Sequence, residues 1–166
     1  MKTCKLLLLT AATMAALLSC SQESEEAPLP NELAGIKLIR HDRNELANSK
    51  LAKMHHNVDF GRYRSVIGTY RNADTEITVY VTMFDDTHQA AEMMTAMAEN
   101  LKAGKSPQFS YVHQLEKSGF TVHLAQSGDS FHYFFRLGKQ DIWLTAPADR
   151  GPEVLDEFLL KYPTGE

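Results

Sequence analysis

A run of short strand-forming segments, separated by glycine-containing turns, extends from residue 109 to residue 145 and constrains the fold more than any other feature. The predicted strands cover residues 109–115, 120–126, 131–137 and 140–145. Gly119, Gly128 and Gly138 lie at the bends, where glycine favours a turn. Gly128-Asp129 and Gly138-Lys139 are suited to two-residue hairpin turns, so we expect a four-stranded antiparallel meander.

Two-residue turns also predict which side chains share a face of the sheet, because side chains alternate between the faces. His123 should lie opposite Phe134, and Phe134 opposite Trp143, with His132 on the same face. The other face should carry an apolar set, namely Val122, Leu124, Tyr133, Phe135, Ile142 and Leu144. We expect this apolar set to pack against the long helix described next.

Residues 87–103 are predicted to form a long helix. Asp86 can cap its N-terminus, and Gly104 can end it at the C-terminus. Its apolar stripe consists of Ala90, Met93, Met94, Met97 and Leu101. Packing of this stripe against the sheet is the preferred interpretation. Methionines at this spacing are also compatible with an adaptable ligand groove or with copper ligation.

The remaining elements complete an α+β pattern. We expect a short strand at residues 36–40, a helix ending near residue 55, a hairpin of residues 64–70 and 75–84, and a last helix beginning near Pro152. Strands in runs, with few alternating helices, indicate an antiparallel sheet. The prediction is a single α+β domain at residues 33–166. It combines an N-terminal hairpin and a C-terminal meander, packed against the methionine-rich helix and the C-terminal helix.

The first twenty residues have the pattern of a secretory signal. Lys2 and Lys5 precede an apolar run over residues 6–18, which is too short for a stable membrane span. The run ends in Leu17-Leu18-Ser19-Cys20, which resembles the lipobox of bacterial lipoproteins. This resemblance implies that residues 1–19 are a signal peptide, that cleavage precedes Cys20, and that Cys20 is lipidated. Two or three acyl chains would anchor the protein to a membrane.

Residues 20–32 are predicted to form the acylated cysteine and a disordered acidic tether, because residues 21–30 are polar, acidic and proline-containing. Ser21, in place of aspartate, resembles lipoproteins that are sent to the outer membrane. The acidic cluster at residues 23–26 resembles a surface-export signal of some Gram-negative bacteria. We therefore expect an outer-membrane location and leave surface exposure open.

Charge and cysteine content exclude several function classes for the mature protein. Without Lys2 and Lys5 it has 15 basic and 21 acidic side chains, a net charge of −6, which argues against a nucleic-acid partner. The lipobox resemblance implies that Cys4 leaves with the signal peptide and that Cys20 carries the lipid. The mature domain therefore lacks a thiol for a disulfide, a zinc-thiolate site or a nucleophile.

Enzyme motifs are absent from the sequence: it contains no Gly-x-Ser-x-Gly, Walker, Gly-x-Gly-x-x-Gly or His-Glu-x-x-His pattern. Asp85-Asp86 is best explained by helix capping. Arg136 and Asp141 should face one another across the last hairpin, as an ordinary exposed pair. Catalysis is therefore left uncertain, with a non-catalytic domain preferred.

The candidate site is the face of the meander that carries histidine and aromatic side chains. His123, His132, Phe134 and Trp143 form a possible ligand-binding surface. A three-residue turn at residues 117–119 would place His113 opposite His123, so that His113, His123 and His132 could bind a first-row metal. A two-residue turn would send His113 to the other face. Coverage of this face by the N-terminal helix is the alternative.

Two functions follow as hypotheses. The first is a lipoprotein domain that binds a small ligand or an envelope protein without catalysis. The second is a metal-binding or haem-binding protein, or a metal-dependent enzyme, that uses the histidine cluster. The sequence does not specify a cofactor, and the membrane is the one partner that it indicates, through Cys20.

Overall fold

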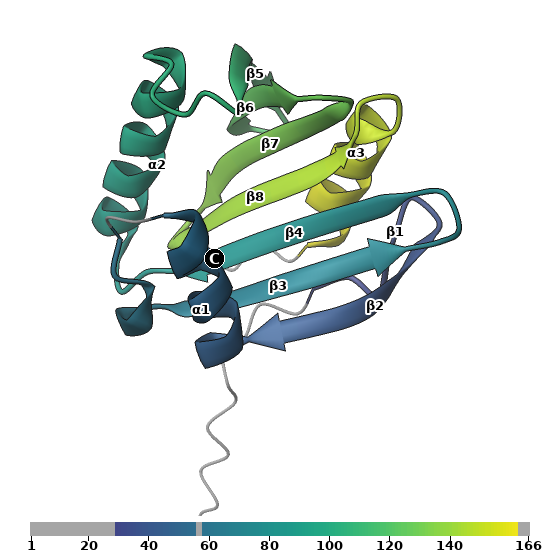
Figure 1. Cartoon of the computed structure of the whole chain (residues 1–166), viewed down its shortest axis with the longest axis horizontal. Coiled ribbons are helices and arrows are strands. Elements are labelled where there is room, and N and C mark those ends of the chain that lie inside the picture. The colour runs from purple at the N-terminus through teal and green to yellow at the C-terminus, as the bar shows by residue number, and fades with distance from the viewer. Residues whose placement is uncertain (1–28, 56–57, 163–166) are drawn as a thin grey trace, which may run out of the picture.

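Strands from both halves of the chain join into one eight-stranded antiparallel sheet, in the order β1-β2-β3-β4-β8-β7-β6-β5 (Figure 1). This computed structural model describes residues 29–55 and 58–162. Its elements are β1 Glu32–Leu33, β2 Ile36–Arg43, α1 Asn44–Met54, a 3-10 turn at Phe60–Arg62, β3 Arg64–Arg71, β4 Glu76–Met83, α2 Thr87–Lys102, β5 Ser110–Lys117, β6 Phe120–Ser127, β7 Ser130–Leu137, β8 Gln140–Pro147 and α3 Gly151–Lys161. The predicted α+β class, with the hairpin β3–β4 and the meander β5–β8, is confirmed.

The hairpins β6–β7 and β7–β8 have the registers expected from their turns. His123 lies opposite Phe134, and Phe134 lies opposite Trp143. Gly128 and Gly138 have φ angles of 55° and 57°, the left-handed conformation that such turns require. These two registers were therefore predictable from local sequence.

Strand β4 pairs with β8 and connects the N-terminal hairpin to the meander. Tyr80 lies opposite Trp143, and Val81 lies opposite Ile142. Because side chains alternate, Tyr80 and Trp143 become neighbours on one face, while Val81 and Ile142 become neighbours on the other. This pairing joins segments far apart in the sequence, and the hydrophobic pattern did not predict it.

Helix α3 covers one face of the sheet, which we call the closed face; Figure 1 shows α3 on the opposite side of the sheet from α1. Its buried residues Val154, Leu155 and Phe158 belong to the largest hydrophobic cluster. That cluster also contains the predicted apolar set, Val122, Leu124, Tyr133, Phe135, Ile142 and Leu144. The expectation that the methionine-rich helix covers this set is wrong. The turn at residues 148–150 leads the chain from β8 directly onto this face, and periodicity does not encode that direction.

Helices α1 and α2 both pack on the other face, which we call the groove face. Met94, Ala98 and Leu101 of α2 form a cluster with sheet residues Ala125 and Phe134. A separate cluster joins α1 to β3 and the 3-10 turn, through Ala47, Leu51, Phe60 and Ile67. The two clusters do not merge, so a space between the helices remains.

The fold begins before the predicted domain boundary. Leu29 is buried in the closed-face cluster, and the Tyr70 hydroxyl donates a hydrogen bond of 2.9 Å to the carbonyl of Pro30. Residues 29–32, predicted as the end of the tether, are therefore part of the packed domain. A single leucine between two prolines forms no periodic pattern, so its burial was not predicted from the sequence. The lipobox and the rest of the predicted tether lie outside the described residues.

Candidate functional site

His113 lies on the other face of the sheet from His123. The turn between β5 and β6 consists of Ser118 and Gly119, with φ angles of 51° and 81°, so it has two residues and not three. His113 is thereby placed opposite Leu124, where it is exposed. Because a shift of one residue exchanges the faces, the predicted arrangement of three histidines is wrong. Within residues 29–55 and 58–162, no group of three or more His, Cys, Asp or Glu side chains is placed to hold a metal ion.

His123 lies beneath α2 and is 8% exposed. Its ring stacks on Phe134 at a centroid distance of 4.9 Å, and its Nδ1 lies 3.1 Å from the hydroxyl of Tyr111. Burial lowers the pKa of His123, so the neutral imidazole is favoured. This histidine therefore behaves as a buried, partnered core residue.

His132 is equally buried and fixes the orientation of Trp143. The indole Nε1 of Trp143 donates to Nδ1 of His132 at 3.2 Å, and Thr145 Oγ1 lies 3.0 Å from the same nitrogen. The edge of the Phe109 ring covers His132 at a centroid distance of 4.8 Å. Burial lowers the pKa of His132 to about 4, so the imidazole is neutral at pH 7.

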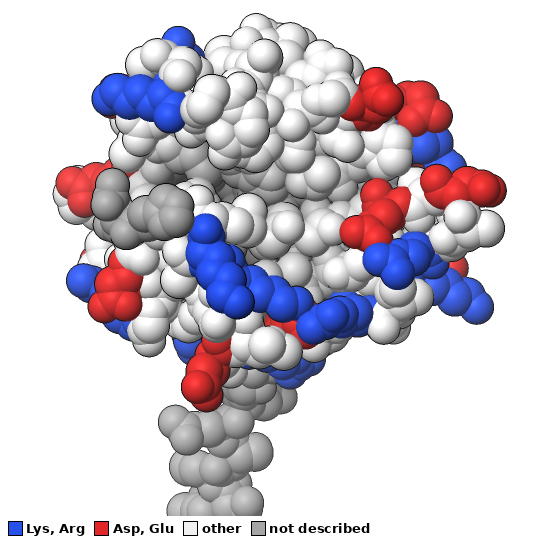
Figure 2. Space-filling model, in the orientation of Figure 1, with Lys and Arg blue, Asp and Glu red and all other residues white. Residues whose placement is uncertain are grey.

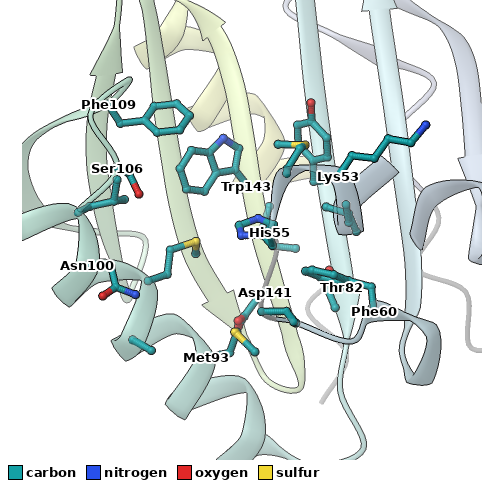
Figure 3. A pocket seen from close by; sticks show the side chains of 18 of the residues that line it. Lys53, His55, Phe60, Thr82, Met93, Asn100, Ser106, Phe109, Asp141 and Trp143 are labelled. Atoms are coloured by element: carbon teal, nitrogen blue, oxygen red, sulfur yellow. The ribbon is translucent and has the colours of Figure 1, made fainter. Parts of the chain in front are cut away.

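A pocket of about 520 Å³ opens on the groove face between α1 and α2 (Figures 2 and 3). Figure 2 shows a largely uncharged hollow with Lys and Arg side chains along its lower border. The lining residues are Leu51, Lys53, Met54, His55, Val58, Phe60, Tyr80, Thr82, Phe84, Met93, Ala96, Met97, Asn100, Leu101, Ser106, Gln108, Phe109, Asp141, Ile142 and Trp143. Of the four predicted ligand-binding residues, Trp143 lines this pocket. His123, His132 and Phe134 are not among the lining residues: Phe134 packs in the cluster formed with α2, and Phe109 packs against His132.

The floor of the pocket is built by the pairing of β4 with β8. Tyr80 lies opposite Trp143, and Thr82 lies opposite Asp141, so the four side chains occupy adjacent positions on one face. The indole of Trp143 also stacks on Phe134, at 5.1 Å between centroids and 15° between planes. Hydrogen bonding and stacking together hold Trp143 as a flat, preoriented surface.

The walls come from the two helices and the segment after α1. Met93 and Met97 of α2 are half-buried and line the pocket, which favours the groove interpretation of these methionines over full burial in the core. On the α1 side the rings of His55 and Phe60 lie 5.4 Å apart. Figure 3 shows Asn100 on one side of the pocket and Phe60 on the other, with Met93 close to Asp141. Thioether side chains adapt readily to the shape of a ligand.

Asp141 is the unusual polar group of this pocket. It is 7% exposed, and neither carboxyl oxygen has a hydrogen-bond partner among the described residues. Burial raises its pKa to about 8, an effect that the charge of Arg136 opposes. Arg136 does lie opposite Asp141, but its Nη1 donates to the carbonyl of Gly138 at 2.8 Å. The prediction of an ordinary exposed pair is therefore wrong.

A sequence signal for Asp141 did exist. Asp141 is two residues from Trp143, so the alternation that places Trp143 on the groove face places Asp141 there too. Its burial could not be inferred, because Thr82 and the α1 side of the pocket come from distant parts of the chain. The pocket positions of His55, Phe60 and Met93 could not be inferred for the same reason.

Comparisons with known protein families, with curated proteins and with solved structures found no match. In the described part of the chain, no helix has both the length and the apolar character needed to cross a membrane. The chemistry of the pocket and the N-terminal sequence are therefore the features of the chain that indicate a function.

Proposed function

We propose that this protein is a lipid-anchored envelope protein whose domain binds a small, largely apolar ligand between α1 and α2, without catalysis. The observation that carries the proposal is the pocket itself, in which Asp141, without a hydrogen-bond partner among the described residues, lies beside the flat surface of Trp143. Apolar pockets with a few convergent polar groups are typical of small-ligand sites. At about 520 Å³, this pocket has a volume in their usual range of roughly 300–1,000 Å³.

The composition of the lining supports binding as the function. Trp143 and Tyr80 offer ring faces for stacking, Met93 and Met97 offer adaptable apolar contact, and Asp141 offers a polar anchor. These features hold and orient a ligand. Ligand binding alone accounts for these side chains, without a catalysed reaction.

The membrane location follows from the lipobox resemblance at Leu17-Leu18-Ser19-Cys20. Lipid on Cys20 would anchor the protein in the bacterial envelope, and Ser21 favours the outer membrane. Leu29, the first described residue, follows Cys20 by nine residues, which can extend over roughly 30 Å. The binding domain would therefore work close to the membrane surface, with exposure at the cell surface left as an outcome for experiment.

Ligand binding can be tested through Trp143, the sole tryptophan of the sequence. A soluble fragment beginning at Ser21 is titrated with Nile red, a neutral apolar dye, while tryptophan fluorescence is followed. We expect saturable quenching at one-to-one stoichiometry, which Ala96→Phe abolishes by filling the pocket. Thr95→Phe, at an exposed α2 position outside the lining, is the matched control. Equal quenching of both variants would contradict binding in the pocket.

Anchoring is tested separately with Cys20→Ser in cells fed a radioactive fatty acid. We expect the unaltered protein to take label and to sediment with membranes, and the variant to do neither. Label on the variant would disprove lipidation of Cys20. Protease treatment of intact cells then distinguishes a surface-exposed domain from a periplasmic one.

A further inference from the structure

The carboxyl group of Asp141 indicates what chemistry the ligand carries. Its side chain is more than nine-tenths buried, lines the pocket, and lacks a hydrogen-bond partner among the described residues. A buried carboxyl group without a partner is destabilising, so a ligand that supplies one gains affinity there. The ionised form of a carboxyl group can only accept hydrogen bonds, and the strongest partner for it is a cationic donor.

Aromatic rings that line the pocket also favour a cation. Trp143, Tyr80, Phe60 and Phe109 all present ring surfaces to the pocket. The face of an aromatic ring attracts an ammonium group, most strongly when that group is removed from water. An organic cation would therefore find partners both at Asp141 and along the floor.

No cationic side chain of the described residues forms a hydrogen bond with the carboxyl group of Asp141. Arg136 of β7 is the cross-strand neighbour, but its guanidinium is exposed and donates to Gly138. From β4, the neighbour is the uncharged Thr82, and the described α2 residues of the lining are uncharged as well. On the α1 side, Lys53 is exposed and points away from the pocket in Figure 3.

His55 and Tyr80, the other titratable groups of the described lining, are expected to be neutral. Burial lowers the pKa of His55 and raises the pKa of Tyr80. Asp141 is therefore the one residue of the described lining that can carry a negative charge. Lys53 is the one lysine or arginine of the described lining, and it points away from the pocket in Figure 3, so among the described residues an anionic ligand would meet no cation beside Asp141.

We propose that the pocket binds a protonated organic amine, with the ammonium group against Asp141 and the apolar body on Trp143. This inference rests on the proposed function, since it names the ligand class of the same pocket. A protonated primary amine supplies up to three N–H donors, so it can provide the hydrogen bond that the carboxyl group lacks among the described residues. A ring or short alkyl chain on the amine would cover the indole and contact Met93 and Met97.

Amine binding should release a proton from the protein. Burial raises the pKa of Asp141 to about 8, so most molecules hold the proton at pH 7, and pairing with an ammonium requires its loss. Affinity for an amine should therefore rise close to tenfold from pH 6 to pH 7 and level off above pH 8. A neutral alcohol needs no such proton loss, and its affinity should not rise with pH.

The test compares three probes of one shape: 2-phenylethylamine, 2-phenylethanol and 3-phenylpropanoate. Each is titrated calorimetrically into the full acylated protein in micelles, and a titration of empty micelles is subtracted. At pH 8 we expect the amine to bind at least tenfold more tightly than the alcohol, and the carboxylate most weakly. Repeating the amine titration at pH 7 in two buffers of different ionisation enthalpy should show close to one proton released.

Substitution then assigns the effect to Asp141. Asp141→Asn should lose at least tenfold in amine affinity at pH 8, along with the pH dependence, and change alcohol affinity less than threefold. Asp149→Asn, at an exposed position outside the lining, should leave all three affinities unchanged.

The outcomes separate this inference from the proposed function. Equal affinity of amine and alcohol, or preference for the carboxylate, would overturn the amine assignment and leave a ligand-binding pocket. Binding of none of the probes, together with no quenching by Nile red, would overturn the proposed function itself. The wild-type comparisons do not depend on the stability of any variant.

Discussion

The closed face and the groove face are formed by alternate residues of the same strands, yet the hydrophobic core is continuous on the closed face and divided on the groove face. On the closed face, α3 and the sheet form one cluster that extends from Leu29 to Tyr162. On the groove face, α1 and α2 form two smaller clusters, and the pocket lies between the helices. Adjacent residues of β8 show the contrast: the side chain of Ile142 is fully buried in the closed-face cluster, whereas the side chains of Asp141 and Trp143 lie on the groove face.

Buried polar groups follow the same division. The seven buried polar side chains of the described residues are Asp42, Asn48, Ser65, Thr82, His123, His132 and Asp141. Strand alternation and the contacts of α1 place all of them on the groove face. A continuous apolar core stabilises the fold, whereas a face with internal polar groups can recognise a ligand. The fold thus has its continuous apolar core on one face and its buried polar side chains on the other.

Truncation should have the largest effect on the closed face. Phe158 is fully buried, stacks on Tyr162 and meets the edge of Phe135. Phe158→Ala should lower the free energy of unfolding by about 3–5 kcal/mol, because it leaves a cavity in a continuous core. Met93→Ala, on the half-buried wall of the pocket, should lower it by about 1 kcal/mol or less. Urea denaturation of both variants measures the difference, and equal losses would contradict the contrast between the faces.

The buried Asp141 should make stability fall as pH rises. The folded state keeps its proton up to a pKa of about 8, and the unfolded chain releases it near the ordinary value of 3.8. Between these values the folded state binds more protons, so the unfolding free energy falls with pH, by up to about 4 kcal/mol from pH 5 to pH 8. Above pH 8 this contribution is constant.

Asp141→Asn should remove this pH dependence and raise the melting temperature above that of the wild type at pH 8. Asp149→Asn, at an exposed position, is the control. Thermal melts followed by circular dichroism from pH 5 to pH 9 provide the measurement. A wild-type curve that is unchanged by Asp141→Asn would show that the carboxyl group has a partner in solution.

Leu29 tests how far the packing of the closed face continues toward the N-terminus. Leu29→Ala should cost about 2–3 kcal/mol of unfolding free energy, which is typical of a buried leucine. An added Cβ at Gly68 would approach Leu29 Cδ1 to 2.5 Å, so Gly68→Ala should also destabilise, and Leu29→Ala should relieve part of that loss. Additive losses in the double variant would argue against this contact.

His132 should act in the opposite pH direction and by a smaller amount. Its pKa falls from 6.5 to about 4 on folding, so the unfolded chain takes up a proton first as the solution is acidified. Stability contributed by the neutral imidazole is present above pH 6.5 and is lost as pH falls through 4. At pH 5 the loss should be about 1 kcal/mol, after allowance for screening by solvent. His132→Asn should flatten the acid limb of the stability curve, and an unchanged limb would contradict burial of a neutral histidine.

Local sequence determined those features that depend on a few neighbouring residues. Gly128 and Gly138 define two-residue turns, and these turns dictate which residues face each other across β6, β7 and β8. Asp86 accepts hydrogen bonds from the backbone N–H groups of His88 and Gln89, as a helix cap should. The α+β class and the face shared by His123, Phe134 and Trp143 followed from these local rules.

The tertiary structure decided which helix covers which face, and with that the position of the site. Hydrophobic periodicity marks one side of a helix as apolar but does not specify its partner, so α3, and not α2, covers the closed face. Ser118 adopts a left-handed φ of 51°, rare for a residue other than glycine, and the resulting turn moves His113 away from the predicted cluster. The pairing of β4 with β8 brings Thr82 beside Asp141. The carboxyl group of Asp141 is desolvated by chain segments that are distant in the sequence. A local sequence pattern therefore cannot predict its burial.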